Sequence, residues 1–301
     1  MAAPAGLTAV IVTYNSSQVL GALLDSLGGA AGSRVRLEVV VVDNHSADGS
    51  VAIAEAHPLA PTVIQSGRNA GYSAAINTAL DRIPAGNAVL ILNPDLRLHP
   101  GAVGAMMDRL TGNTGIVVPR LVRPDGRLHH SIRREPSLLT AWSEALLGGD
   151  LAARLGLGEI VAQSQCYNRF GPVTCASGAA LLVSPEARER IGSWSEAFFL
   201  YSEEIDYMRR ARDFGFDIVY EPAAVASHVG GESNSNPDLF ALLTANRIRY
   251  YRHYHGAASA ALFQLGVIAG LVLRLGQGAI HRSALRAAMT ASQGRFAVRT
   301  R

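Results

Sequence analysis

The sequence predicts an α/β protein with a mostly parallel sheet flanked by helices and a helical segment at the C-terminus. Apolar runs rich in valine and isoleucine alternate with helical patterns through about the first 120 residues, which is typical of successive β-α-β units. The runs are apolar at nearly every position, so we expect both faces of each strand to be buried. A nearly continuous apolar stretch at 258–273 follows near the C-terminus.

The elements follow in order. We expect a first strand at 7–14 and then a helix that Ser16 or Ser17 caps and whose leucines share one face. Further strands are expected at 36–43, 61–65 and 87–92, and helices at 50–57 and 71–82. After an apolar run at 114–120 comes a turn at 123–127, and 131–172, with weak periodicity, is expected to leave the sheet.

Composition limits the functional classes. With 301 residues, 49% of them hydrophobic, the chain is long enough for one sizeable core with an appendage. All 27 basic residues are arginine and the net charge is only +3, so we predict no nucleic-acid partner. Cys166 and Cys175 form neither a CxxC pair nor a disulfide framework, which fits a reducing cytoplasm. The N-terminus lacks a basic start before its apolar run, so we expect no secretion.

Four strand-like runs end on polar residues. These ends are Thr13 to Asn15, Asp43 to His45, the loop from Arg68 to Gly71, and Asn93 to Asp95. A parallel sheet gathers such ends at one edge, where α/β enzymes bind ligands. Turn formation alone explains the segment after Asp43 equally well.

A nucleotide suits this edge. Asp43 can accept a hydrogen bond from the imide N–H of uracil or thymine, and Arg68 can contact phosphate oxygens. No GxGxxG follows the first strand and no GxxxxGK[ST] occurs, which disfavours a Rossmann dehydrogenase and a P-loop nucleotidase.

Eight segments occur in an order that a known family shares: VIVTYNS, VVVVDNHSADGS, GRNAGYSAAINTAL, ILNPDLRL, CASGAALLVSPE, FFLYSEEIDYMRRARDFGF, ASHVGGES and NRIRYYRHYHG. On these segments the chain resembles the inverting family 2 glycosyltransferases of GT-A fold, in particular bacterial dTDP-rhamnosyltransferases of cell-wall and polysaccharide assembly. The resemblance implies a catalytic domain over 1–255, with a nucleotide-binding half at 1–120 and an acceptor and catalytic half at 121–255. A helical segment follows at 256–301.

The resemblance implies a donor site and a metal. Mg²⁺ or Mn²⁺ would be held by Asp95 and His228, which suit a mixed oxygen and nitrogen site. Asn93 stands where the family has an acid, which lowers the expected metal affinity. The implied nucleotide-sugar site comprises Thr13, Tyr14, Asn15, Asp43, Asn44, Arg68, Asn69, Gly71, Asn77, Asn93, Asp95 and Gly178. We assign no role to His45, His57, His99, His129 and His130.

The resemblance also implies the catalytic base. Glu204 occupies the position of the family's catalytic aspartate, and Glu203 would support it. An acidic first helical turn, paired with the arginines that follow, is the structural alternative. The implied acceptor residues are Tyr201, Asp206 and Arg247.

The predicted reaction transfers L-rhamnose from a dTDP-sugar to a lipid-linked or polysaccharide acceptor, with inversion. The alternatives are a UDP-hexose donor, a catalytically silent nucleotide-sugar-binding protein and a nucleotidyltransferase. The run at 258–273 is short for a membrane span, and we expect it to lie on the inner face of the cell membrane. Packing against the catalytic domain or against a twin subunit in a homodimer is the alternative.

Overall fold

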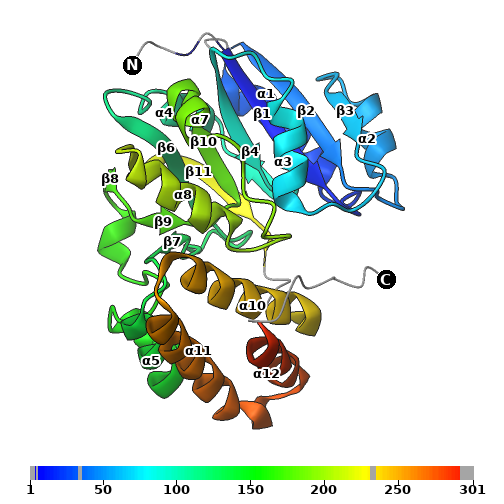
Figure 1. The fold of residues 1–301 in the computed structure, drawn as a ribbon. Helices are drawn as coiled ribbons and strands as arrows, with labels where there is room; N and C mark the ends of the chain where they lie inside the picture. Colours follow the sequence, from blue (N-terminus) through cyan, green and yellow to red (C-terminus); the bar gives the residue numbers. More distant parts are fainter. Residues whose placement is uncertain (1–3, 5, 33–35, 231–234, 292–301) are drawn as a thin grey trace.

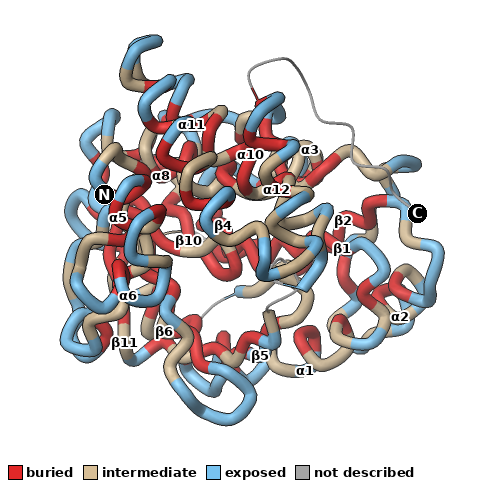
Figure 2. Tube along the Cα trace, turned by 90° about the horizontal axis from the view of Figure 1, so that it is seen from below, coloured by how far each residue is buried: buried red, intermediate tan, exposed pale blue. Residues whose placement is uncertain are grey.

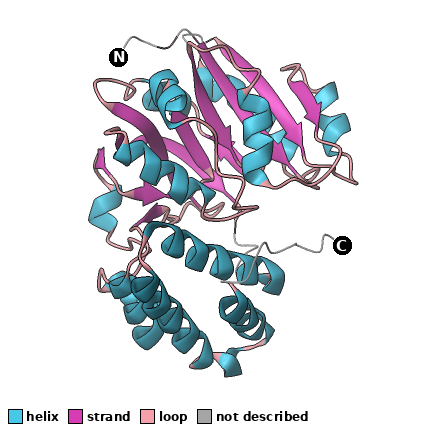
Figure 3. Cartoon of the chain, viewed as in Figure 1, coloured by secondary structure: helices cyan, strands magenta, loops and turns pink. Residues whose placement is uncertain are grey.

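The protein consists of a helix-flanked sheet and a separate helical unit (Figures 1 and 3). The structure, a computed structural model, describes residues 4, 6–32, 36–230 and 235–291. The helical unit lies beyond the edge at which β1 and β4 end, with α10 nearest the sheet (Figure 1). Any ligand bound at that edge therefore faces the helical unit.

The strands of the main sheet are β1 (Gly6–Thr13), β2 (Leu37–Asp43), β3 (Thr62–Gln65), β4 (Asn87–Leu92), β5 (Leu96–Leu98), β6 (Thr114–Val122), β8 (Gly171–Pro172), β10 (Ala180–Val183) and β11 (Asp217–His228). Their order is β3-β2-β1-β4-β10-β6-β11-β5, with β8 beside β11. The ladders β1–β2, β1–β4, β2–β3 and β6–β11 are parallel, and β10 runs antiparallel between β4 and β6. The prediction of a mostly parallel sheet is confirmed. A second, two-stranded sheet pairs β7 (Ile132–Arg133) with β9 (Cys175–Ala176).

Helices cover both faces of the main sheet. The helices around it are α1 (Leu20–Ala31), α2 (Ser50–Ala56), α3 (Tyr72–Leu80), α4 (Ala102–Met107), α7 (Pro185–Ile191) and α8 (Glu203–Asp213). Alternate side chains of β1 point to opposite faces: Ile11 joins the cluster under α1, α2 and α4, and Val10 joins the cluster under α3, α7 and α8. The strands and the inner helix faces are buried (Figure 2). The expected burial on both faces is confirmed.

The helical unit consists of α5 (Leu138–Leu147), α6 (Gly149–Arg154), α10 (Pro237–Tyr254), α11 (Ala257–Val272) and α12 (Ala279–Thr290), with 3₁₀ turns at Ser164–Tyr167 and Leu275–Gln277 nearby in the chain. Ala141 of α5 and Ile248 of α10 share one apolar cluster with Phe263 and Ala288. The expected departure of 131–172 from the main sheet is correct for α5 and α6 but wrong for its end, because β8 pairs with β11 in that sheet. α5 shares its apolar cluster with helices that lie about 100 residues or more further along the chain.

One local prediction is wrong. Neither Ser16 nor Ser17 caps α1 with its side chain, because the helix begins at Leu20 after Val19. Ser16 Oγ instead contacts the backbone of Tyr14, and the Ser16 carbonyl accepts from the amides of Val19 and Leu20. A backbone turn therefore replaces the cap.

Candidate active site

The ends of β1 and β2 hold a buried carboxylate in a fixed orientation. Asp43 accepts hydrogen bonds from Thr13 Oγ1 at 2.8 Å and from Ser46 N at 2.8 Å and Ser46 Oγ at 2.5 Å. Asn15, in the left-handed region at φ 51°, donates from its backbone to Ser46 Oγ and accepts from Ala47 N. Three of about four acceptor positions on Asp43 are thus used, and the carboxylate is held rigidly for a further donor.

The loop before α3 connects this edge to the segment that leads into α8. Asn44 Nδ2 donates to Gly71 O at 3.0 Å, and Asn69 Oδ1 accepts from Gly71 N. Gly71 has φ 92°, and a Cβ there would lie 2.5 Å from Phe199 O. Tyr72 N donates to that same carbonyl at 2.7 Å. Only glycine allows this close approach, which places the predicted donor loop beside α8.

Three other residues of the predicted donor site are Tyr14, Arg68 and Asn77. Tyr14 and Arg68 are exposed at the edge. Asn77 is engaged elsewhere: its side chain donates to Trp194 O and Glu196 Oε1 and accepts from Trp194 N. The structure thus brings Tyr14 and Arg68 to the edge with Asp43. The Asn77 amide instead binds the segment before α8 through hydrogen bonds.

Asp95 and His228 meet where β4 and β11 end. Asp95 Oδ2 lies 3.3 Å from His228 Nε2 and accepts from Gly230 N at 2.9 Å. Burial alone would raise the pKa of Asp95, but the hydrogen bond and charge of His228 and the Gly230 amide together lower it. His129 stacks on His228 with ring centroids 5.1 Å apart and fixes the imidazole plane.

This pair fits a divalent cation. Neighbouring ligands about 2.1 Å from one hard cation lie roughly 3 Å apart, close to the observed separation of the Asp95 oxygen and the His228 nitrogen. His228 Nδ1 is buried without a partner among the described residues, so Nε2 is the atom turned to the carboxylate. No cluster of three or more His, Cys, Asp or Glu side chains within the described ranges is arranged for a metal. A cation at this pair would have the Asp95 oxygen and the His228 nitrogen as its protein ligands.

The first turn of α8 carries two carboxylates with few donors. Tyr201 and Ser202, at φ 70° and 75°, form a left-handed turn that begins the helix. Glu203 is 4% exposed and its Oε2 has no hydrogen-bond partner in the described chain. Glu204 is half-buried, and a Cβ at Gly178 would lie 3.1 Å from its Cβ. Glu204 therefore lies directly against the glycine that was predicted beside the donor sugar.

Tyr72 connects the two groups of acids. Its hydroxyl donates to Asn93 Oδ1 at 2.9 Å. Burial, followed by the charges of Glu203, Glu204 and Asp95, raises the pKa of Tyr72, so the phenol lies within electrostatic range of all three carboxylates. It remains a hydrogen-bond donor at neutral pH.

The two glutamates share one environment and hold protons more tightly than a free glutamate. Burial and then the charge of Glu204 raise the pKa of Glu203 well above 4.5, and burial raises the pKa of Glu204 as well. Burial therefore favours the protonated form of both glutamates, and the two carboxyl groups titrate as a pair.

The predicted acceptor residues join α8 to the helical unit. Asp206 accepts from Arg210 Nε at 2.9 Å and from Tyr254 OH at 2.6 Å. Asn246 Nδ2 donates to the carbonyls of Leu200 and Tyr201. The helical unit is thus fastened to the turn that begins α8.

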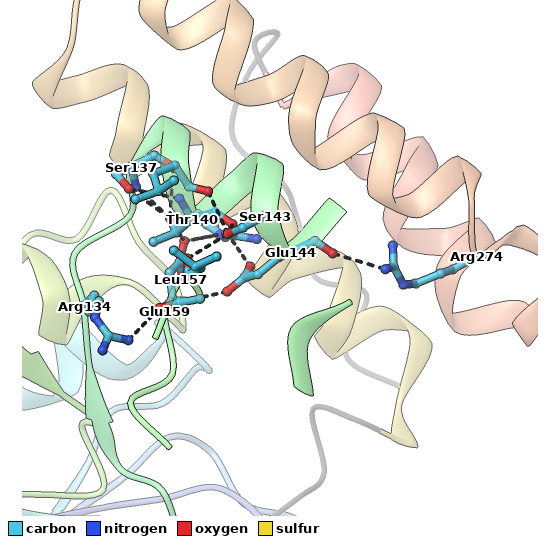
Figure 4. A network of polar contacts seen from close by, with 11 residues as sticks. Arg134, Ser137, Thr140, Ser143, Glu144, Leu157, Glu159 and Arg274 are labelled. Carbon is cyan, nitrogen blue, oxygen red and sulfur yellow. Dashed lines mark hydrogen bonds and ion pairs between the residues drawn. The ribbon is translucent and has the colours of Figure 1, made fainter. Parts of the chain in front are cut away.

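Arg247 lies in a buried ionic network. It pairs with Glu144 at 2.7 Å and with Glu159 at 2.5 Å, and Glu144 Oε1 accepts from Glu159 N. Figure 4 shows Glu144 between Glu159 and Arg274, which donates to the Glu144 carbonyl. The Arg247 guanidinium is therefore engaged with the protein, and its role toward an acceptor stays a prediction.

Sequence reasoning missed His129 and Tyr72. No role was expected for His129, because a single histidine in an irregular segment carries no signal. Tyr72 follows the loop glycine directly, and its position at the start of a helix at the sheet edge was the available signal. Tertiary contacts bring both beside the site.

Comparisons with known proteins identify the family of the chain. Residues 8–167 match the family model for glycosyl transferase family 2. An N-acetylglucosaminyl-diphospho-decaprenol L-rhamnosyltransferase of Mycobacterium tuberculosis is 30% identical over 234 residues, 74% of this chain and 75% of the relative. A low-salt glycan biosynthesis hexosyltransferase of Haloferax volcanii is 29% identical over 211 residues, 68% of this chain and 61% of the relative.

Two solved structures share the fold. A mannosyltransferase of Pyrobaculum calidifontis, in complex with GDP-Man and Mn²⁺, superposes with a TM-score of 0.58 at 19% identity, covering 94% of this chain and 80% of that chain. Residues 1–349 of S. aureus TarS with UDP superpose with a TM-score of 0.51 at 14% identity, covering 97% and 92%. The sheet and its helices thus define a glycosyltransferase of the GT-A fold. The chain belongs to glycosyl transferase family 2.

Proposed function

We propose that this glycosyltransferase moves L-rhamnose from dTDP-rhamnose to a hydroxyl of a lipid-linked or polysaccharide acceptor, with inversion. The observation that carries the proposal is the placement of Glu204 against Gly178, with Tyr72 linking this position to the edge that holds Asp95 and His228. The name of the mycobacterial relative, which specifies rhamnose and a lipid-linked N-acetylglucosamine, supports the choice of sugar and acceptor.

The residues divide the chemistry between them. Asp43 accepts from the imide of the pyrimidine, and Arg68 contacts the diphosphate. A divalent cation held by Asp95 and His228 would supply positive charge to the leaving diphosphate. Glu204 takes the proton of the acceptor hydroxyl while the oxygen of that hydroxyl bonds to the anomeric carbon. The bond between the anomeric carbon and the diphosphate oxygen breaks at the same time, and the nucleoside diphosphate leaves. Direct displacement inverts that carbon, so no glycosyl-enzyme forms.

We place the proposed reaction on the cytoplasmic side of the membrane, because the cysteine usage of the chain fits a reducing cytoplasm. The Asp43 carboxylate does not distinguish thymine from uracil, since both carry the same imide donor. A UDP-hexose donor is therefore the second candidate, and the hexosyltransferase name of the Haloferax relative favours testing it.

A nucleotide panel tests the donor site. We would measure the melting temperature with dTDP, UDP, GDP and ADP, with and without Mn²⁺, for wild type and Asp95→Ala. Stabilisation by a pyrimidine diphosphate that needs Mn²⁺ and disappears in Asp95→Ala is the expected result. Transfer assays with dTDP-rhamnose and UDP-hexoses then identify the sugar. Stabilisation by GDP or ADP alone would refute the role of Asp43 and the choice of donor.

A further inference from the structure

The outward faces of α5 and α11 are apolar along their whole length. Exposed positions of surface helices normally carry charged or polar side chains. Here every exposed residue of the two helices is apolar, and the largest are Leu146 at 69%, Leu139 at 62%, Leu265 at 54% and Leu262 at 48% exposed. We call this set the apolar face: Leu139, Trp142, Leu146, Leu147, Ala257, Ala258, Ala261, Leu262, Leu265 and Val272.

The two helices approach closely enough to present one surface. A Cβ at Gly266 of α11 would lie 3.2 Å from Trp142 Nε1, and a Cβ at Gly270 would lie 3.0 Å from the Cα of Ala145 in α5. Arg274 closes the end of both helices by donating to the carbonyls of Gly270 at 2.7 Å and Ala145 at 3.0 Å. Figure 1 shows the helices side by side below α10. The apolar face is therefore continuous across them.

The charged residues of α11, α12 and the turn between them are all basic. From 256 to 291 the sequence contains Arg274, Arg282 and Arg286 and no Asp or Glu. Arg282 and Arg286 are exposed. Asp150 of α6 is balanced in number by the exposed Arg154. A helical unit with an apolar face and exposed arginines on α12, a helix that packs against α11, complements an anionic lipid bilayer. A second copy of the chain fits less well, because the same stretch of that copy contains no Asp or Glu to complement these arginines.

We propose that the apolar face inserts shallowly into an anionic bilayer surface and anchors the helical unit there. No helix in the described ranges is long and apolar enough to cross a membrane. α10 contacts the carbonyls of Leu200 and Tyr201, so an anchored helical unit keeps the start of α8 near the lipid surface. The proposed anchor does not depend on which sugar is transferred, and vesicle binding can be measured without the transfer reaction.

The first test is sedimentation of the full chain with vesicles of phosphatidylcholine containing phosphatidylglycerol. Leu262→Gln with Leu265→Gln keeps the helix and the net charge but removes the apolar insertion, and we expect binding at least about tenfold weaker. The matched control is Phe170→Gln with Phe214→Gln, which changes two aromatic side chains, 47% and 45% exposed, in the sheet domain. The control should bind like wild type.

The second test addresses charge. Arg282→Gln with Arg286→Gln should weaken binding about tenfold and reduce its sensitivity to salt and to phosphatidylglycerol content. The control, Arg36→Gln with Arg127→Gln, removes two arginines that are 83% and 79% exposed in the sheet domain. Nucleotide-induced stabilisation should persist in all four variants, which separates loss of the anchor from loss of the donor site.

Three results would overturn the anchor. Wild type could fail to sediment with anionic vesicles, or Leu262→Gln with Leu265→Gln could bind as tightly as wild type. Analytical ultracentrifugation could instead reveal a dimer that this double variant dissociates, with no vesicle binding, and the apolar face would then be a subunit interface. None of these results bears on the choice of donor, which nucleotide binding reports.

Discussion

Two regions of the site hold buried carboxylates in opposite ways. At the sheet edge, Asp43 and Asp95 each accept from backbone amides, and Asp95 also faces an imidazole. On α8, Glu203 has an oxygen with no donor among the described residues, and burial raises the pKa of Glu203 and of Glu204. The difference shows that the surroundings of a carboxyl group decide its protonation: hydrogen-bond donors favour the ionised form, and desolvation favours the protonated form.

The helix dipole of α8 explains only one of the carboxylates in its first turn. An acidic first turn is favoured at a helix N-terminus, and Asp206 fits that description because it pairs with Arg210. Arg209, in contrast, pairs with Glu135 and Asp213. The structural alternative, an acidic turn paired with the arginines that follow, therefore accounts for Asp206.

The largest expected effect separates the two glutamates of α8. Glu204→Gln removes the proton acceptor, so we expect the transfer rate to fall by about 10²- to 10⁴-fold. Nucleotide binding should be retained, because the change lies outside the sheet edge. The measurement is the transfer rate at saturating donor, with the nucleotide-induced shift in melting temperature as the check of folding.

Glu203→Gln is the matched control. Burial raises the pKa of Glu203 well above its usual value and favours its uncharged form, so the uncharged amide of glutamine should change the rate by only a few-fold. A larger loss in Glu203→Gln than in Glu204→Gln would reverse the assignment of the base.

Asp95→Asn tests the other side of the comparison. It keeps the side-chain shape but removes the charge that His228 and Gly230 favour. We expect a rate loss of about 10²-fold and weaker stabilisation by nucleotide with Mn²⁺. The Mn²⁺ concentration that gives half of the maximal stabilisation should be higher for Asp95→Asn than for wild type. Unchanged Mn²⁺ dependence would mean that Asp95 does not hold the cation.

The acid limb of the pH–rate profile gives a smaller effect. Because the pKa of Glu204 is raised above 4.5, the base stays protonated to a higher pH, and activity should increase with pH through a limb that lies above that value. Glu203→Gln should keep the limb above pH 4.5, because burial is the main cause of the raised pKa of Glu204. A limb below pH 4.5 would show that burial does not control the base.

Much of the fold could be predicted from sequence because its first half is locally encoded. β1, β2 and β4 are continuous apolar runs that end on polar residues, and their predicted bounds differ from the observed ones by at most one residue. The antiparallel placement of β10 between β4 and β6 could not be predicted, since a strand of four residues gains its place from its neighbours.

The site shows the same limit. Asp43 and His228 end strands, and Asp95 lies in the short link between β4 and β5. All three were predicted, and the structure brings Asp95 to His228. The stacking of His129 on His228 depends on a turn and a bridge between Val122 and Leu128, contacts that no periodic pattern indicates. Likewise, Ile132 pairs with Ala176 across 44 positions of chain, and this pairing carries Ser177 and Gly178 to Glu204. Long-range pairs of short strands have no local signature.

The smallest effect concerns a third group of carboxylates, in which burial outweighs a neighbouring cation. Burial raises the pKa of Glu159 to about 6, although Arg247 lowers it and Glu144 raises it further. The folded protein therefore holds this proton more tightly than the unfolded chain, whose glutamate titrates near 4.5. The stabilising contribution is complete below about pH 4.5 and is lost as the pH rises through about 6, a change of about 2 kcal/mol in the free energy of unfolding.

Urea unfolding measured between pH 4.5 and 7 tests this contribution. The Glu159→Gln variant should lack the change, and Glu38→Gln, which removes a carboxylate paired with Arg36 at the surface, should keep it. A wild-type free energy of unfolding that rises between pH 4.5 and 6 relative to Glu159→Gln would show that Arg247 outweighs burial and that this group resembles the sheet edge rather than α8.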